Sequence, residues 1–429
     1  MSSKVSYNLD NIREILNADK FNVSKSVRFI LLGLVIIGIV AFFMILNHGD
    51  AKRAWAVFQV NSIYWTVMSA AGTCFTAVFY ITNAEWSRPV RRIFESYSNF
   101  FLISPLLFVI MYFFGADHVF SWIHEPVGTK GKDFWLSKDF LYLRDLLALS
   151  LIIVISRKAV KLTLKRDLLV ARSSDEFGSR WNDKCYDAIV GNTKGDLKSE
   201  LDMIGYKMGR LSPAVIIFFA ICLSLVAFDQ EMSVDPHWFS TLFGAFVFMG
   251  GVYIAFSWLA MLIFLTRNSN KIFKKYTLRT TLHDAGKMLF GFGIFWAYLF
   301  WSHYLPLWYA NMPEETQWLI LRARDLPWRN LAWTVLGGCF ILPFFLGLNR
   351  DLKQVPVFLF CTGLIVAVSM WLQHYILFVP TLYKTSIPLG IEEVFVTLGF
   401  AGLFILLSFN FLSKYPLIQV GDIYLKAKK

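Results

Sequence analysis

Long apolar runs separated by short polar segments dominate the chain. An α-helix needs about twenty apolar residues to cross the hydrocarbon core of a bilayer. Ten runs reach this length, so the pattern predicts an all-α polytopic membrane protein with about ten transmembrane helices. The predicted spans cover residues 28–47, 57–82, 97–115, 140–157, 211–228, 238–266, 284–309, 330–349, 355–379 and 391–413.

The composition agrees with this class. Hydrophobic residues make up 56% of the chain and charged residues 17%, against about a quarter charged in soluble proteins. The mean hydropathy is +0.51, and the 15 Trp and 17 Tyr are typical of aromatic belts at the two membrane interfaces.

The first residues form a polar tail that is too long for a usual signal peptide. The apolar run that follows lacks a small-residue cleavage site, so we expect it to be a retained first helix. The predicted organisation is an N-terminal tail (1–27), helices one to four (28–156), a basic loop (157–210), helices five to ten (211–413) and a C-terminal tail (414–429).

Positive charge is distributed unequally between the two sides. The side of the termini holds 31 Lys and Arg, the opposite loops hold nine, and the spans hold two. The positive-inside rule therefore predicts that both tails are cytoplasmic, in a bacterial inner membrane. The net charge of +12 reflects this topology, so no nucleic-acid partner is expected.

The loop 157–210 is the one long loop. Its apolar pattern suggests short amphipathic helices, read as an extension of helix four that lies along the lipid headgroups. A docking surface for a partner is the alternative. The loop 157–210 contains no glycine-rich phosphate-binding sequence, which argues against an ATP-driven pump.

Ionisable residues gather near both ends of the predicted helices. A charge at the bilayer centre costs roughly 2.5–3.5 kcal/mol, so such residues need a reason. The candidates for two proton half-paths are Asp284 and Lys287 on the cytoplasmic side, and Arg144, Asp145, His303, His374, Glu392 and Glu393 on the outer side. The alternative for each of them is a structural or interfacial role.

A hydroxyl stripe on the second helix connects the two layers. Thr66, Ser69, Thr73 and Thr76 recur at the spacing of one helical face. They are candidates for a wetted middle section of a proton path, or for close helix packing.

Metal and haem sites are not expected in this chain. The five Cys are far apart and form no CxxC or Cys/His pattern. His303 and His374 share one depth on different helices, as axial haem ligands do, but both lie near the outer surface and no second pair exists.

Three segments carry a resemblance to a known family. They are NAEWSRPVRRIFE (83–95), MSVDPHWFSTLFG (232–244) and DAGKMLFGFGIFWAYLFWSHYLPLWYANMPEET (284–316). They resemble the second NrfD-like (polysulfide-reductase-type) membrane subunit of bacterial alternative complex III, a quinol:electron acceptor oxidoreductase. The likeness covers nearly the whole chain.

The resemblance implies two four-helix bundles, helices two to five and six to nine, flanked by helices one and ten. It implies a subunit without a cofactor of its own, in which proton half-channels have been proposed. The expected partners are the sister NrfD-like subunit, an iron–sulfur subunit, multihaem and monohaem cytochrome c subunits, small membrane subunits, lipids and a terminal oxidase. The expected substrate of the complex is a quinol such as menaquinol.

Two other functions are weighed against this one. A quinol-oxidising subunit would need a binding site, for which His303, Trp301 and Tyr304 are the best candidates, although they also fit an interfacial aromatic belt. A secondary transporter should have broken helices at matching positions of two repeats. Gly337, Gly338 and Pro343 interrupt helix eight, but its counterpart, helix four, has no Gly or Pro.

Overall fold

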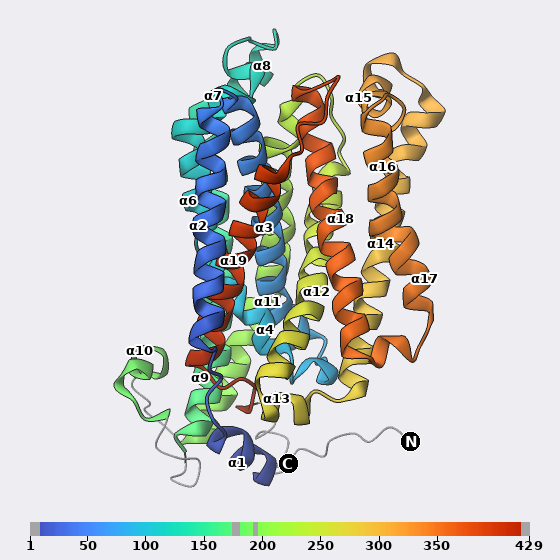
Figure 1. The fold of residues 1–429 in the computed structure, drawn as a ribbon. Coiled ribbons are helices and arrows are strands. Elements are labelled where there is room, and N and C mark those ends of the chain that lie inside the picture. Colours follow the sequence, from blue (N-terminus) through green and yellow to red (C-terminus); the bar gives the residue numbers. More distant parts are fainter. Residues whose placement is uncertain (1–8, 174–180, 192–195, 422–429) are drawn as a thin grey trace.

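The helices of the protein stand side by side in one bundle. The computed structural model describes residues 9–173, 181–191 and 196–421, and every regular element in these residues is helical. The first helix, α1 (Leu9–Asn17), and the last described residues lie at the same end of the bundle, here called the terminal end (Figure 1). The opposite, distal end carries the short helices α8 (Lys130–Trp135) and α15 (Pro313–Ala323) (Figure 1).

Within the described residues, nine helical stretches are long and apolar enough to cross a membrane. They confirm the predicted class of an all-α polytopic membrane protein. They are α2 (Lys25–Asn47), α3 (Ala51–Ile81), the broken stretch Arg91–Val119, the stretch Leu197–Val234 that begins with α11 (Leu197–Gln230), α12 (Phe243–Ser269), α14 (Arg279–Ala310), the broken stretch Trp328–Leu348, α18 (Pro356–Leu382) and α19 (Ile391–Lys414).

The two broken stretches consist of shorter elements. The first contains α4 (Arg91–Ser96), α5 (Ser98–Phe101), α6 (Ser104–Ile110), the π-helical turn η2 (Met111–Gly115) and α7 (Ala116–Val119). The second contains α16 (Trp328–Leu336), the π-helical turn η8 (Gly337–Ile341) and α17 (Leu342–Leu348).

The tenth predicted span, 140–157, lies within α9 (Lys138–Ala171) and is not among these nine. An uncharged stretch of only 11 residues separates Arg144 and Asp145 from Arg157. The helix nevertheless runs from the distal to the terminal end of the bundle, beside α11 (Figure 1). Arg144 and Asp145 have partners on α11, as described below.

The helices pack as two groups of four. The first group contains α3, the Arg91–Val119 stretch, α9 and α11, and the second contains α12, α14, the Trp328–Leu348 stretch and α18. The groups meet where α12 packs against α3 and α11. This is the arrangement of two bundles that the resemblance implies.

Helices α2 and α19 pack against each other along the side of the first group (Figure 1). Their backbones approach so closely that a Cβ atom on Gly38 would lie 2.7 Å from the Cα atom of Gly399. Small residues that permit such close approach are characteristic of helix contacts in membranes. Gly38 and Gly399 therefore fix this pair by shape.

Proline leaves a carbonyl of the Trp328–Leu348 stretch without its usual partner. Pro343 has no N–H to donate to the carbonyl of Cys339, four residues earlier. The hydroxyl of Tyr253 in α12 donates to that carbonyl at 2.9 Å. The break in the helix is thus accommodated by a neighbouring helix, as expected inside a membrane.

The basic loop is more helical than its sequence suggested. Helix α9 continues to Ala171 and α11 begins at Leu197, so both extend beyond the predicted spans. Between them the structure describes the short helix α10 (Asp187–Val190), while residues 174–180 and 192–195 lie outside the described parts. Helix α13 (Lys271–Tyr276) also lies at the terminal end (Figure 1).

The topology can be tested by cysteine labelling in intact cells and inverted vesicles. We expect a cysteine at Ser413 to react from the cytoplasm and one at Gly128 to react only from outside, because positive charge concentrates at the terminal end. Exposed Cys185 and Cys361 are first replaced by Ser. Labelling of both new sites from one side would refute the topology.

Candidate functional site

A cluster of buried acidic residues lies near the distal end of the first helix group. We call Arg144, Asp145, Asp229, Gln230, Glu231 and His374 the distal cluster. Arg144 of α9 donates from Nε and Nη2 to the two carboxylate oxygens of Asp229, at 2.6 and 2.5 Å. The guanidinium group also stacks on Trp135, 3.8 Å from the ring centroid. Asp229 on α11 thus balances the positive charge that Arg144 places within α9.

The next residue on each helix extends the cluster inward. The amide of Gln230 donates to Asp145 at 2.7 Å, and the amide of Gln59 in α3 donates to Gln230 at 2.8 Å. All three side chains are buried. The contacts therefore form a polar connection from α9 through α11 to α3.

A histidine–carboxylate pair completes the cluster. The Nδ1 atom of His374 in α18 lies 2.8 Å from an oxygen of Glu231, and both side chains are fully buried. The other nitrogen of His374 and the other oxygen of Glu231 have no hydrogen-bond partner within the described protein. Both groups can therefore still accept or donate a hydrogen bond to water.

The distal cluster contains more acid than base. It holds three buried carboxylates, while its ion-pair partners within the described residues are Arg144 and His374. Arg322, which is also buried, acts electrostatically on Glu231, so the three carboxylates face two permanent positive charges. One negative charge then remains, and an unpaired buried charge is costly. We infer that a proton within the cluster, on His374 or on a carboxylate, balances it.

The predicted hydroxyl stripe is buried and longer than expected. Gln59 and Ser62 continue the spacing of three and four residues, so that one face of α3 carries Gln59, Ser62, Thr66, Ser69, Thr73 and Thr76. We call this the α3 stripe. The hydroxyl oxygens of Thr66, Ser69 and Thr76 have no partner within the described protein. The stripe thus begins at Gln59, which donates to Gln230 of the distal cluster.

Glu392 and Glu393 do not belong to the distal cluster. Both contact Arg53 at the start of α3, and Glu393 also accepts from the backbone N–H of Gly390 at 2.6 Å. The second interaction caps the first turn of α19. These contacts give the two glutamates a structural role at the helix end.

Asp284 and Lys287 form a pair on the surface of the terminal end. They lie 2.6 Å apart, but the Lys287 side chain is 55% exposed and that of Asp284 is 25% exposed. A pair with this exposure contributes about 0–1 kcal/mol. Among the described residues, no hydrogen bond or ion pair connects this pair to the buried polar groups.

A second candidate site is an aromatic pocket in the distal half of the second helix group. It has a volume of about 410 Å³ and is bounded by α12, α14, α15, α16 and α18. All three predicted quinone-site residues contribute to its wall, together with many other aromatic side chains. The aromatic and histidine lining comprises Trp238, Phe243, Phe246, Trp296, Phe300, Trp301, His303, Tyr304, Trp318 and Trp333.

Three buried polar atoms in the wall of this aromatic pocket have no partner. They are Nε1 of Trp238, Nε2 of His303 and Nε2 of Gln373. The oxygen of Gln373 accepts from Trp296 at 2.5 Å, which fixes the orientation of the amide. The N–H groups of Trp238 and Gln373 are unmatched donors, whereas Nε2 of His303 is an acceptor when Nδ1 donates to the carbonyl of Leu299. Unmatched donors in an apolar cavity favour a ligand that carries oxygen acceptors.

Arg322 supports the wall of the pocket. Pro380 provides no N–H for the carbonyl of Ile376, and Nε of Arg322 donates to that carbonyl at 3.0 Å. Burial lowers the pKa of this guanidinium group to about 9, so it remains charged at neutral pH. The guanidinium group stacks on the ring of Trp318. That ring in turn stacks on Trp238, with 4.0 Å between the two ring centroids.

The two sites touch through adjacent residues of α18. Gln373 lines the aromatic pocket, whereas His374 binds Glu231 in the distal cluster. The two histidines singled out from the sequence are therefore separated: His303 contacts the carbonyl of Leu299 and faces the pocket.

Sequence reasoning missed Asp229, Gln230 and Glu231. The fifth predicted span ends at residue 228, which places these three residues in a loop, whereas α11 continues through Gln230. Their charge complementarity to Arg144 at the same predicted depth is a signal that could have revealed them. Gln373 gave no such signal, because a single amide in an apolar run has no predictable partner.

The energetic importance of the distal cluster can be measured directly. We expect Arg144→Met to lower the free energy of unfolding by about 3–5 kcal/mol, because it leaves buried Asp229 without its partner. The exposed cation Lys287 provides a matched control, and Lys287→Met should change stability by less than about 1 kcal/mol. Denaturant titration in detergent tests both. Equal effects would contradict the assignment of Arg144.

Comparison with known proteins does not assign the chain to a family. No protein-family model matches it, and no curated protein sequence matches it. The function inferred below therefore depends on the geometry of the two sites and on the resemblance of the three sequence segments.

Proposed function

We propose that the chain is a membrane subunit of a bacterial respiratory complex that oxidises quinol, and that it transfers protons without holding a redox centre. The expected redox partners are the iron–sulfur and cytochrome c subunits. The proposed location is the inner membrane, with the terminal end in the cytoplasm. The resemblance of the three segments and the buried polar residues both support this proposal.

The distal cluster is the observation that carries the proposal. Quinol oxidation releases protons as well as electrons, so a complex that conserves energy needs groups that hold and pass protons. Carboxylates and the histidine ring can each take up a proton and give it up again. Glu231 and His374, each with one unpartnered polar atom, are the central pair in this role.

The α3 stripe carries side chains that can pass a proton toward the terminal end. Each hydroxyl can both donate and accept a hydrogen bond. From Gln59 to Thr76 the stripe extends over 18 residues, or about 25 Å of helix, which is most of a hydrocarbon core of about 30 Å. Water is needed between the hydroxyl groups, and the three without partners are the positions where it would bind.

The role of the central pair is tested with Glu231→Gln in the purified complex, reconstituted in vesicles. We expect proton transfer per electron to fall at least about twofold, because the variant keeps the shape of the side chain but cannot hold the proton. Electron transfer should continue. Asp284→Asn and Lys287→Met are controls that should leave the ratio unchanged, and a wild-type ratio in Glu231→Gln would contradict the proposal.

Quinol binding by this chain is the second candidate function. The aromatic pocket supports it, because a planar ring with two oxygens matches aromatic walls and the free donors of Gln373 and Trp238. His303, Trp301 and Tyr304 would then contribute to the wall around the ring.

Pocket binding is tested by filling the cavity. Ala332→Phe adds a ring to the wall contributed by α16 and should reduce the quinone that co-purifies with the isolated chain at least about tenfold. Gln373→Leu should weaken retention less, since it removes one donor only. Quinone is quantified by extraction and chromatography, and retention at the wild-type level in Ala332→Phe would exclude the pocket as a quinol site.

A further inference from the structure

A short segment after the last membrane helix folds back under the bundle. Helix α19 ends at Lys414, and the following residues have no regular structure until Gly421. Ile418 and Val420 are nevertheless fully buried, and Gln419 is 1% exposed. This C-terminal segment, residues 415–421, is therefore an integral part of the terminal end.

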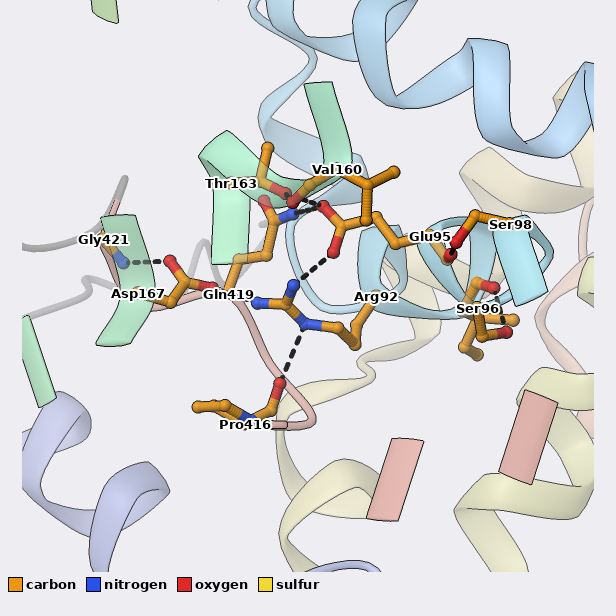
Figure 2. Close-up of polar contacts among 11 residues, drawn as sticks. Arg92, Glu95, Ser96, Ser98, Val160, Thr163, Asp167, Pro416, Gln419 and Gly421 are labelled. Carbon is orange, nitrogen blue, oxygen red and sulfur yellow. Dashed lines mark hydrogen bonds and ion pairs between the residues drawn. The ribbon is translucent and has the colours of Figure 1, made fainter. Parts of the chain in front are cut away.

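The segment closes over a buried cluster of charges, shown in Figure 2. We call Arg92, Glu95, Thr163, Asp167 and Gln419 the terminal cluster. Arg92 contacts both carboxylates, and all three charged side chains are completely buried. Arg92 and Glu95 come from α4, and Thr163 and Asp167 come from α9.

The C-terminal segment supplies three of the polar contacts in this cluster. The carbonyl of Pro416 accepts from Arg92 at 2.9 Å, and the amide of Gln419 contacts Glu95 at 2.5 Å. The backbone N–H of Gly421 donates to Asp167 at 2.8 Å (Figure 2). A displaced segment would leave all three charged groups short of a partner.

The hydrogen atoms around Glu95 favour a protonated carboxyl group. The Thr163 hydroxyl has one hydrogen but lies within bonding distance of two acceptors, Glu95 at 2.7 Å and the carbonyl of Val160 at 2.8 Å. If Glu95 carries a proton, it donates to the hydroxyl, which then donates to Val160. Each polar atom in this series of hydrogen bonds then has a partner.

Gln419 is the second polar neighbour of this oxygen of Glu95. Its amide nitrogen donates to Glu95 at 2.5 Å, and its buried amide oxygen has no partner within the described residues. Reversing the amide would leave the nitrogen, with its two hydrogens, without a partner instead, so the amide is better satisfied as a donor to Glu95.

The charged neighbours of Glu95 are few. Arg92 lies on its own helix, and Asp167 and Arg166 lie on α9, with Arg166 beside Gly421. Arg92 is shared between Glu95 and Asp167, and Arg166 adds a second positive charge nearby. Two cations therefore face two carboxylates that are both completely buried, and a neutral Glu95 avoids the cost of burying one of these negative charges.

The terminal cluster also lies near the inner end of the α3 stripe. Helix α4 packs against α3, and Arg91, adjacent to Arg92, donates to the carbonyl of Phe79, three residues beyond Thr76. The pair Asp284–Lys287 lies on the surface instead. Among the described residues, Glu95 is thus a buried acid placed near this end of the stripe.

We propose that Glu95 is the group that binds protons at the cytoplasmic end of the path, and that the C-terminal segment is a lid that separates it from water. This inference rests on the proposed function. The proton is taken from water when the segment opens, the carboxylate becomes neutral, and the closed segment then holds it beside Thr163 and Gln419. No bond other than O–H forms or breaks.

Infrared spectroscopy of the purified complex tests the proton on Glu95 independently of turnover. We expect a carboxylic-acid C=O band that is absent in Glu95→Gln and shifted in Thr163→Val, which removes its hydrogen-bond partner. Glu14→Gln is the control, because this carboxylate pairs with Lys275 outside the cluster. An unchanged set of bands in Glu95→Gln would overturn the assignment.

The lid is tested by access to Val160→Cys, a buried position beside the cluster. Gly421→Ala should increase the labelling rate by an impermeant thiol reagent about tenfold, because the added Cβ would lie 2.6 Å from Cγ of Arg166. Gly209→Ala is the matched control, since no atom lies within 4 Å of its Cβ position. Equal rates in the two variants would exclude a lid.

The two proposals fail in different ways. If the wild-type complex transfers no protons with its electrons, the proposed function fails, while the band and the labelling rates still report on Glu95. If proton transfer is present and Glu95→Gln leaves its ratio per electron unchanged, Glu95 is not on the path. We expect that ratio to fall at least about twofold.

Discussion

Charged side chains inside a membrane protein must find partners within the protein, because the bilayer core offers none. In this chain the pairing of Arg144 with Asp229 shows how that constraint shapes a whole region. It allows α9 to cross the bundle despite its short uncharged stretch, and it holds α9 and α11 together at the distal end. The carboxylates beside this pair then lie where positive charge is scarce, and we propose that they bind protons.

The charged groups at the two ends of the bundle are partnered in different ways. At the distal end three carboxylates share Arg144 and His374, and three polar atoms, on Asp145, Glu231 and His374, have no partner within the described residues and can meet water. At the terminal end a folded-back segment encloses Arg92, Glu95 and Asp167 completely (Figure 2). Between them one face of α3 carries only neutral polar groups. We interpret this as two sites of proton binding joined by groups that can pass a proton but not retain it.

The fold was predictable from the sequence to a large extent, because apolar runs of membrane length are a strong signal. The α3 stripe was predictable in part from its helical spacing, while its extension to Gln59 was not. The partners of Arg144 were missed because the end of an apolar run does not mark the end of a helix. The position of Glu95 under the C-terminal segment depends on contacts across more than three hundred residues, which no local pattern encodes. Asp284 and Lys287 had the expected spacing, but spacing does not reveal that the pair faces outward.

The link between Gln59 and Gln230 is where the distal cluster meets the α3 stripe, so it provides the most direct test of a continuous path. The measurement is proton transfer per electron in vesicles containing the Gln59→Leu complex, which keeps every charge in place. We predict a loss of at least about half of the coupled protons, with electron transfer maintained. A ratio equal to that of the wild-type complex would show that protons do not pass along α3, and would contradict the account.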